Sequence, residues 1–524
     1  MIPRRIHRAV VILFLVRTHL STRIAAFSPK KVPEAKDIAY NQARRIRTLQ
    51  GHDDALPFYQ QLLVENDDYS AASHLAASPW TPIRQDHACQ WEAVHQLHTL
   101  RNILLEEYTH ANIQQMMNIP PQGTCRGPVY LNPVAAGTCK TPPLVESKLD
   151  CLVTLFLLSI CLPVETVTTF LGNDTIHLLQ QLGLAFVSDD NLLLVPFVHL
   201  FPLDCYYDCD CSDTYDSVVN NQTLILATDL HPRVLSTTLV GTQHHGPVMY
   251  IGPDSLALVS HMPKMKHEWK HVLDLCTGSG IQALAILLST RYYDCNVTCV
   301  DINPRALQFT RFNAALNGLD VATIQGDLIT GNMEGVWQNK YDLILANPPF
   351  IPVPPTKEIL QRYGLFSSGG PDGEIVLRNI IEQAGKSLSK ENGLLAIVSE
   401  FMNPQDPALL ERLQTWWGDT NLATGVLLTN QIPLNDEIYA ARRADSKEEY
   451  HIWLEHLRHH DISYVSPGLL FIQSSASESK SRKSLDLHHQ IVPKTQLGSI
   501  WTPSNSDAGA FVGKVVQCMM AGNQ

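Results

Sequence analysis

No stretch of this 524-residue sequence is both apolar enough and long enough to cross a membrane as a helix. The uncharged run from Cys151 to Leu162 falls well short of the roughly 20 apolar residues that a span requires. It predicts a helix buried in a protein core. A basic surplus is also missing, because the formal net charge is −12 and the pI is about 6.0. That balance lowers the expectation of nucleic-acid binding, although a local basic patch could still provide it.

A cysteine framework is missing as well. The 12 cysteines are scattered along a long chain, unlike those of a small secreted disulfide scaffold, so we expect reduced thiols. Only the segment CYYDCDC groups them, at Cys205, Cys209 and Cys211. A zinc site would need a fourth ligand, and the nearest candidate, His199, lies in an apolar stretch. We therefore predict no metal site and interpret this segment as a loop with free thiols, with metal binding as the alternative.

The amino-terminal segment contains no acidic residue before Glu34. Its apolar run from Ala9 to Val16 lies among the arginines Arg4, Arg5, Arg8, Arg17 and Arg23. An arginine-rich, acid-free segment of this kind is typical of a targeting leader, so residues 1–32 are predicted to be one. The segment IAAFSPKK also resembles the Ala-Phe cleavage signal of some plastid leaders. We expect a plastid protein with no stable membrane association once the leader is removed; a mitochondrion or the cytoplasm are the alternatives.

Residues 33–243 are predicted to form a mainly helical domain. Its last part reads as three helices followed by a β-ribbon, which is the order of elements in a winged helix. The second member of its helix-turn-helix, Asn173 to Gly183, contains neither lysine nor arginine, so it is a poor candidate for reading DNA. A winged-helix-like domain used for protein contact is the preferred interpretation, and a helical cap on the next domain is the alternative.

Apolar strands alternate with helices over residues 244–473. This alternation predicts an α/β domain, with a mostly parallel, doubly wound sheet covered by helices on both faces. Residues 474–524 begin with the polar segment SSASESKSRKS and are predicted to be a flexible linker and tail.

The segment VLDLCTGSGIQAL places Gly278 and Gly280 in the turn between a strand and its helix, where the backbone can approach a ligand closely. Asp301, at the end of the next strand, could bind both hydroxyls of a ribose. Asp274 precedes the glycines, where a carboxylate suits a cationic ligand better than a pyrophosphate, and Asp327 could accept from the adenine amine. S-adenosylmethionine has an amine, a sulfonium, a ribose and an adenine, and it has no phosphate. It therefore fits this pattern better than NAD does.

The segment DLILANPPF ends a buried strand at Asn347. The amide carbonyl of Asn347 and the backbone carbonyl of Pro348 could accept the two N–H bonds of a planar nitrogen and hold it in line for methyl transfer. Pro348 and Pro349 fix the backbone, and Phe350 could stack on the flat group. Asn347, Pro348, Pro349 and Phe350 are therefore the predicted catalytic residues. The alternative is a strand that simply stops at a capping asparagine.

With these motifs, the chain resembles class I S-adenosylmethionine-dependent methyltransferases of the methyltransferase small domain group. Within that group it is most similar to the HemK-like glutamine N-methyltransferases, over roughly Met249 to Gln473. The resemblance implies a seven-stranded Rossmann-like sheet and a cofactor site made of Asp274, Thr277, Gly278, Gly280, Asp301, Asp327 and Asn347. Two residues depart from the family pattern. Cys276 replaces the first loop glycine, and Phe350 replaces the more frequent tyrosine.

The resemblance implies an enzyme that methylates a protein glutamine amide, with a peptide release factor as the expected substrate and a monomer as the expected state. An exocyclic-amine methyltransferase acting on RNA or DNA uses the same motif and is the first alternative. A non-catalytic protein that binds S-adenosylmethionine is the second. An NAD dehydrogenase is disfavoured, because nothing beside the glycine turn would supply a partner for hydride transfer.

Overall fold

The computed structural model describes residues 91–117, 145–157, 161–188, 191–207, 220–229, 248–262, 269–289, 295–333, 335–363, 366–419, 422–475 and 484–492. The targeting leader predicted for residues 1–32 therefore lies outside the described residues, and so do Cys209 and Cys211 of the cysteine-containing segment. Cys205 is described and is buried. Within these ranges, no helix is long and apolar enough to cross a membrane.

The amino-terminal helices come first along the chain. They are α6 (Trp91–Leu105), α7 (His110–Met117), α9 (Lys148–Leu152), the π-helical turn η1 (Val153–Leu157), α10 (Val164–Leu171) and α11 (Asn173–Gln181). The described residues of the uncharged run, 151–157 and 161–162, are buried, as the sequence predicts, although they divide among α9, η1 and β1. Three short strands form a sheet in the order β1-β3-β2, namely β1 (Leu162–Pro163), β2 (Ala185–Val187) and β3 (Leu193–Pro196).

This order of helices and strands matches the one expected for a winged helix, and the winged-helix-like domain itself stays a prediction. β2 and β3 form the antiparallel ribbon, and β1 pairs with β3 on its other side. The residues of α11 that stay exposed are polar or acidic, among them Asp174 and His177, and no basic side chain accompanies them apart from that histidine. The surface of α11 therefore provides no cation to bind a phosphate backbone.

A long hairpin connects this unit to the rest of the chain. It consists of β4 (Val198–Tyr207) and β5 (Asn220–Asp229), which pair antiparallel. Two asparagine side chains hydrogen-bond the backbone of β5 as a neighbouring strand would: Asn313 at Ala227 and Asn317 at Ile225. At the end of β5, the Asp229 carboxylate pairs with both terminal nitrogens of Arg305, and both side chains are buried. The hairpin is therefore docked on the α/β domain by specific polar contacts.

The large sheet contains nine strands, in the order β14-β11-β13-β10-β9-β6-β7-β8, with β12 paired to β13. Their bounds are β6 (His271–Leu275), β7 (Asn296–Asp301), β8 (Ala322–Gln325), β9 (Leu343–Ala346), β10 (Leu394–Met402), β11 (Ala423–Asn430), β12 (Leu434–Asn435), β13 (Tyr464–Ser474) and β14 (Leu485–Val492). The five strands from β10 to β8 are parallel to one another, and β13 runs antiparallel between β10 and β11. The predicted α/β class and largely parallel sheet are confirmed.

The sheet differs from the seven-stranded expectation by the strands β12 and β14. β14 pairs in parallel with β11 and lies inside the segment for which the sequence predicts a linker and tail, so that prediction is wrong for residues 485–492. Leu485, Leu487 and Val492 are buried there. The polar segment before β14 dominates the local composition, so composition alone does not indicate a strand at these apolar residues. The other predicted domain boundaries fall outside the described residues and stay predictions.

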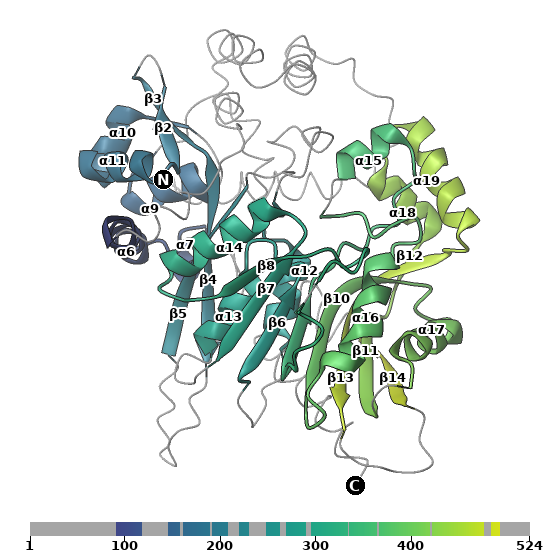
Figure 1. Cartoon of the computed structure of the whole chain (residues 1–524). Coiled ribbons are helices and arrows are strands. Elements are labelled where there is room, and N and C mark those ends of the chain that lie inside the picture. Colours follow the sequence, from purple (N-terminus) through teal and green to yellow (C-terminus); the bar gives the residue numbers. More distant parts are fainter. Residues whose placement is uncertain are drawn as a thin grey trace.

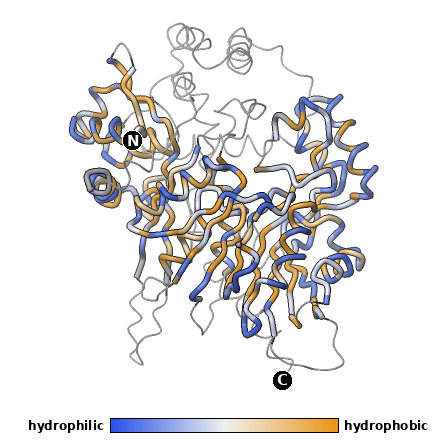
Figure 2. The backbone as a smooth tube through the Cα atoms, viewed as in Figure 1, coloured by the Kyte–Doolittle hydropathy of each residue, from blue (hydrophilic) through white to orange (hydrophobic). Residues whose placement is uncertain are grey.

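Helices cover both faces of the sheet, as a doubly wound fold requires (Figure 1). The apolar residues of α12 (Pro253–Ser260), α13 (Ile281–Ser289) and α14 (Pro304–Leu316) share one buried cluster with the amino-terminal unit. Those of α16 (Ile375–Ser387) and α17 (Pro407–Trp417) belong to a second cluster on the opposite face. The strands between them are largely hydrophobic (Figure 2).

A small helical group lies beside the carboxyl end of β10 (Figure 1). It consists of α15 (Lys357–Tyr363), α18 (Asp436–Arg443) and α19 (Lys447–His459), packed around the fully buried Trp453. α18 and α19 lie between β12 and β13 in the chain.

Strand order reverses between β6 and β9, since the chain runs outward from β6 through β7 to β8 and outward from β9 to β10 on the other side. In open α/β sheets the crevice at the carboxyl ends of such strands is where ligands bind. The glycine turn follows β6 and Asn347 follows β9, so the fold brings both sequence motifs to this point.

Candidate functional site

A pocket opens at this reversal point, with about 1010 Å³ of space including its open mouth. Of the residues predicted from sequence, its wall contains Thr277, Gly278, Asp301, Asp327, Asn347 and Pro349. Asp274, Gly280, Pro348 and Phe350 are close in sequence to this wall but do not form part of it. The two motifs thus meet at one cavity, which is large enough for a nucleoside-sized ligand.

The turn after β6 is built from residues with left-handed backbone angles. Gly278 has a φ of 57° and Gly280 a φ of 84°, and a Cβ on Gly280 would lie 3.0 Å from the Thr310 side chain. Cys276 adopts a φ of 56°, which is unusual for a residue with a side chain. Three residues of the turn therefore have left-handed backbone angles, which glycine adopts most easily. Two of them are glycines, and the third is Cys276.

A matched pair of variants tests this backbone requirement. In ordinary helical or extended positions alanine is more stabilising than glycine, but a left-handed position costs a residue with a Cβ about 1–2 kcal/mol. We expect Cys276→Gly to be more stable than Cys276→Ala by about 1 kcal/mol, as measured by the midpoint of urea unfolding. Both variants lose the sulfur atom, so their difference isolates the backbone. An alanine variant as stable as the glycine variant would contradict the assigned conformation.

Asp274 lies behind the turn rather than in the pocket wall, and it is 1% exposed. Its Oδ2 accepts hydrogen bonds from Thr277 Oγ1 (2.6 Å) and from the backbone N–H of Ala283 (3.3 Å), while its Oδ1 has no partner. Burial, together with the nearby charge of Asp301, raises the pKa of Asp274 to about 7, against the lowering effect of those two bonds. A cation bound in front of the turn would favour the ionised form of this carboxyl.

Asp301 lies at the end of β7 and in the pocket wall. Its Oδ2 accepts from the backbone N–H of Gly278 (2.9 Å), and its Oδ1 accepts from that of Asn303 (2.9 Å). Burial raises the pKa of Asp301, and these backbone hydrogen bonds act in the opposite direction. Each oxygen keeps a further lone pair for a ligand hydroxyl. The predicted position of Asp301 beside the glycine turn is therefore realised.

Asp327 lies after β8, at the other end of the wall. Its Oδ1 accepts from the backbone of Ile329 (2.8 Å) and Thr330 (3.3 Å), and its Oδ2 accepts from Thr330 Oγ1 (2.8 Å). Ile302 and Ile329 also line the pocket. Apolar side chains beside a carboxylate suit a flat heteroaromatic ring with an exocyclic amine.

Gln282 is a pocket residue that sequence reasoning missed. It lies in the first turn of α13, is 3% exposed and lines the pocket, and its side-chain nitrogen has no hydrogen-bond partner. An unpaired buried amide nitrogen is costly unless a ligand accepts from it. The backbone N–H groups at a helix start also favour an anion there. The sequence signal was a polar residue within the apolar run GIQALAILL.

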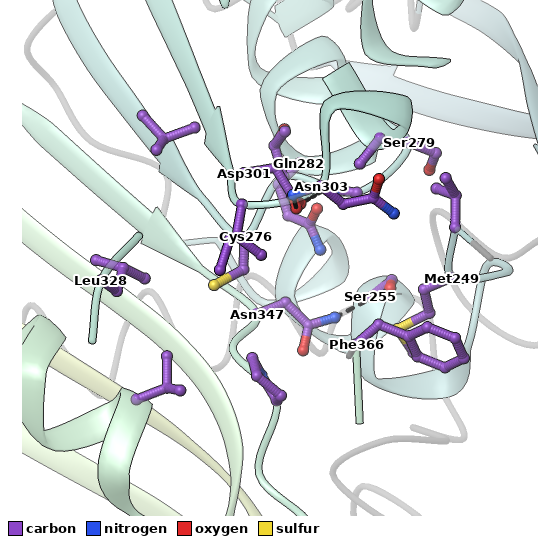
Figure 3. Close-up of a pocket in the computed structure, with 18 of the residues that line it drawn as sticks. Met249, Ser255, Cys276, Ser279, Gln282, Asp301, Asn303, Leu328, Asn347 and Phe366 are labelled. Carbon is purple, nitrogen blue, oxygen red and sulfur yellow. Dashed lines mark hydrogen bonds between the residues drawn. The ribbon is translucent and has the colours of Figure 1, made fainter. Parts of the chain in front are cut away.

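Asn347 is held by residues from a distant part of the chain. Its side-chain nitrogen donates to Asp254 Oδ2 (3.0 Å) and to Ser255 Oγ (3.1 Å), both at the start of α12. Because both N–H bonds are used, the amide orientation is fixed, and Oδ1 is left buried without a partner. Figure 3 shows the bond to Ser255, with Cys276 on one side of Asn347 and Phe366 on the other. The site thus presents a fixed hydrogen-bond acceptor.

Phe350 contacts the apolar cluster around Trp453 and is not part of the pocket wall. The aromatic side chains of the wall are Tyr250 and Phe366, next to Met249 and Pro349. A Cβ on Gly373 would lie 2.6 Å from the Phe350 carbonyl, so the loop after Phe366 packs tightly on the Asn-Pro-Pro segment. The structure therefore offers Phe366 as a second candidate for stacking, which the sequence did not indicate.

Among the described residues there is no group of His, Cys, Asp or Glu side chains that could hold a metal ion. The segment with Cys209 and Cys211 is outside that part of the chain.

Residues 250–362 match the family model of the methyltransferase small domain. Over this segment the chain resembles methyltransferase small domains. It is also 35% identical over 164 residues to a ribosomal protein uL3 glutamine methyltransferase of Bradyrhizobium diazoefficiens, which covers 30% of this chain and 49% of that protein. A release factor glutamine methyltransferase of Deinococcus radiodurans is 35% identical over 153 residues, which cover 28% of this chain and 51% of that protein. The resemblance inferred from the motifs is confirmed.

The chain thus spans about half the length of these curated relatives. The release factor glutamine methyltransferase of Mycobacterium leprae is 32% identical over 183 residues, covering 32% of this chain and 61% of that one. Among solved structures, a putative class I S-adenosylmethionine-dependent methyltransferase from Listeria monocytogenes is 13% identical with a TM-score of 0.30, over 55% of this chain and 76% of its own.

Proposed function

We propose that this protein transfers a methyl group from S-adenosylmethionine to the side-chain amide nitrogen of a glutamine in a protein. The observation that carries the proposal is the amide of Asn347, whose two N–H bonds are used by Asp254 and Ser255 and whose oxygen remains an acceptor. A carboxamide substrate has two N–H donors and a flat shape, which such an acceptor complements.

The pocket residues fit S-adenosylmethionine. Asp301 would bind the ribose, Asp327 the adenine amine and Gln282 the carboxylate, with Asp274 providing negative charge behind the turn. When bound, S-adenosylmethionine would supply a methyl group activated by a positively charged sulfur, with S-adenosylhomocysteine as the leaving group. The substrate nitrogen would then be cationic and would release its proton to water. No arginine or lysine is among the described residues that line the pocket, so a pyrophosphate would meet no cation from them.

The protein residues prepare the substrate nitrogen. Hydrogen bonds accepted by Asn347 Oδ1 and, as predicted from sequence, by the Pro348 carbonyl would orient its lone pair and favour a tetrahedral nitrogen as charge develops. Phe366 or Phe350 would pack against the flat carboxamide. A strong base is unnecessary, since the nitrogen becomes acidic once it is methylated.

Removing the Gln282 amide should weaken the binding of S-adenosylmethionine more than that of a related ligand without a carboxylate. Loss of a hydrogen bond to a charged group costs about 1.5–3 kcal/mol, so Gln282→Leu should reduce affinity by roughly tenfold to a hundredfold. Calorimetry with 5′-methylthioadenosine, which has no carboxylate, is the control, and its affinity should stay within about threefold. Equal losses for both ligands would show that Gln282 only shapes the pocket.

Two protein substrates follow from the relatives, whose names give release factors and ribosomal protein uL3 as targets. We place the release factor first, as the resemblance implies. The winged-helix-like unit would then contact protein, in keeping with the absence of lysine and arginine from α11. We also propose that residues 1–32 direct the chain to an organelle, a plastid first, which fusion of this segment to a fluorescent protein would test.

The test of function uses the full chain and methyl-labelled S-adenosylmethionine. Separate reactions contain a purified organellar release factor, ribosomal protein uL3 and ribosomal RNA. Label in a protein whose target glutamine is present, and its loss when that glutamine is changed to asparagine, is the expected result. Label in the RNA alone would establish the exocyclic-amine alternative and overturn the proposal.

A further inference from the structure

The proposed function rests on Asn347, yet the residues that orient Asn347 come from α12, far away in the sequence. Gly252 is the N-cap of α12, Pro253 begins it, and Asp254 and Ser255 lie in its first turn. Asp254 is 2% exposed and Ser255 is 4% exposed, so contact with water does not explain a polar side chain at either position. Burying an aspartate costs free energy unless its oxygens accept hydrogen bonds. The burial of Asp254 therefore needs an explanation specific to this position.

The local backbone makes room for the Asp254 carboxylate. A Cβ on Gly252 would lie 2.3 Å from Asp254 Oδ1, so the carboxylate folds back over a position that only glycine leaves open. The start of a helix also favours a negative charge. Burial raises the pKa of Asp254; the Asn347 amide and backbone N–H groups lower it, and Glu400 on β10 raises it. The carboxylate is thus held by α12 and directed at Asn347.

The hydrogen-bond roles leave one orientation for the Asn347 amide. The nitrogen of Asn347 faces Asp254 and donates to its Oδ2 at 3.0 Å, which suits an ionised carboxylate because such a group only accepts hydrogen bonds. Ser255 Oγ accepts the second N–H at 3.1 Å (Figure 3). If the amide turned over, its oxygen would face a carboxylate oxygen at about the same 3.0 Å, which is repulsive. Asn347 Oδ1 is buried and has no protein partner.

We infer that Asp254 and Ser255 are positioning residues, which lock the Asn347 amide so that its oxygen faces the substrate nitrogen. Asp254 sets which end of the amide is the acceptor, and Ser255 sets its rotation. Neither residue needs to touch the reacting atoms. This inference deepens the proposed function and rests on it.

If Asp254 and Ser255 only orient Asn347, changing them should lower kcat but leave the Kd for S-adenosylmethionine nearly unchanged. Asp254→Leu keeps the branched shape of the side chain but replaces the acceptor oxygens with methyl groups, and Ser255→Ala removes the second acceptor. We expect kcat to fall by roughly tenfold to a hundredfold for Asp254→Leu and by about threefold to tenfold for Ser255→Ala, since a small misplacement of a reacting group has costs of this order. The Kd for S-adenosylmethionine should stay within a few-fold in both variants. Asp406→Leu is the control, because Asp406 is an exposed helix cap on α17 that also loses its charge.

A swapped pair separates orientation from simple stability. Asn347→Asp alone places two carboxylates about 3.0 Å apart and should lose most of its turnover. In the double variant Asp254→Asn with Asn347→Asp, the new amide at position 254 can donate to the new carboxylate at position 347, whose other oxygen stays available as the acceptor. We expect the double variant to recover at least about tenfold in kcat over Asn347→Asp. A purely structural role for Asp254 predicts no recovery and a loss of cofactor binding along with turnover, which would overturn the inference.

A measurement without substrate keeps this test independent of the proposed function. In protein labelled with ¹⁵N-asparagine, the Asn347 side-chain amide is identified by its loss in Asn347→Ala. We expect its protons to exchange slowly in the wild-type protein and at least about tenfold faster in Asp254→Leu. If wild-type protein methylates no glutamine but shows this difference, the function fails and the lock stands. If glutamine is methylated and exchange is equally fast in both proteins, the lock fails and the function stands.

Discussion

Asn347→Ala is expected to lower turnover by roughly a hundredfold to a thousandfold while S-adenosylmethionine binding stays within a few-fold. Loss of one preorganised partner of a transition state has an effect of this size. Asn347 is only one of many residues in the pocket wall, and the cofactor contacts that we propose come mainly from the residues after β6, β7 and β8. Single-turnover kinetics at saturating cofactor, together with calorimetry, separate the two effects.

Two other variants complete the test of Asn347. Phe350→Ala should mainly weaken substrate binding if Phe350 stacks on the substrate, because stacking acts on ground and transition states alike. Phe366→Ala is the comparison, since the Phe366 ring is in the pocket wall while Phe350 contacts the cluster around Trp453. Normal turnover by Asn347→Ala on its true substrate would end this interpretation.

The second large effect is expected at Asp301. Asp301→Ala removes a carboxylate that can bind a ribose by charge-assisted hydrogen bonds, and it leaves the backbone N–H groups of Gly278 and Asn303 without their acceptor. We expect a loss of about 2 kcal/mol or more in S-adenosylmethionine binding, or roughly thirtyfold in Kd. S-adenosylhomocysteine should lose affinity to a similar extent, because it has the same ribose.

Asp320→Ala is a suitable control for Asp301→Ala. Asp320 is an exposed acid in the loop before β8, so its loss changes the net charge equally without touching the pocket. NAD should bind neither the wild-type protein nor this control. Tighter binding of NAD than of S-adenosylmethionine would contradict the cofactor assignment.

The sheet was predictable where strands are continuous apolar runs. β6, β9 and β10 are almost entirely buried, and the turn residues that follow β6 and β9 are adjacent to these strands in sequence. Strand order then brings the two motifs together, as the carboxyl ends of neighbouring parallel strands must meet at one edge. β14 was missed because its pairing with β11 is decided by tertiary contact and not by a strong local pattern.

The site was predictable only in part, for a similar reason. Asp274, Asp301, Asp327 and Asn347 each follow or lie near a strand end, so their positions follow from the fold. Asp254 and Ser255 reach Asn347 across more than ninety residues of sequence. Gln282 differs from its neighbours only in being polar. Contacts of this kind depend on how α12 and α13 pack, which one sequence does not contain.

The docking of the amino-terminal hairpin also could not be read from the sequence. Asn313 and Asn317 look like ordinary exposed residues of an amphipathic helix, but in the structure they are buried and hydrogen-bond the backbone of β5. Val248, which lines the pocket, donates its backbone N–H to Asp229 at the end of the same strand. The pocket wall and the hairpin are thus joined through Asp229.

The central claim is that the methyl group is attached to a carboxamide nitrogen, and acid hydrolysis of the labelled product tests it most directly. N-methylated glutamine has its methyl group on the amide nitrogen, so hydrolysis releases the label as volatile methylamine and leaves unlabelled glutamate. We predict that most of the label from the wild-type reaction with the release factor appears as methylamine, and that Asn347→Ala produces almost none in the same time. Label that stays non-volatile, in a methylated base or in a methylated lysine or arginine, would contradict the account.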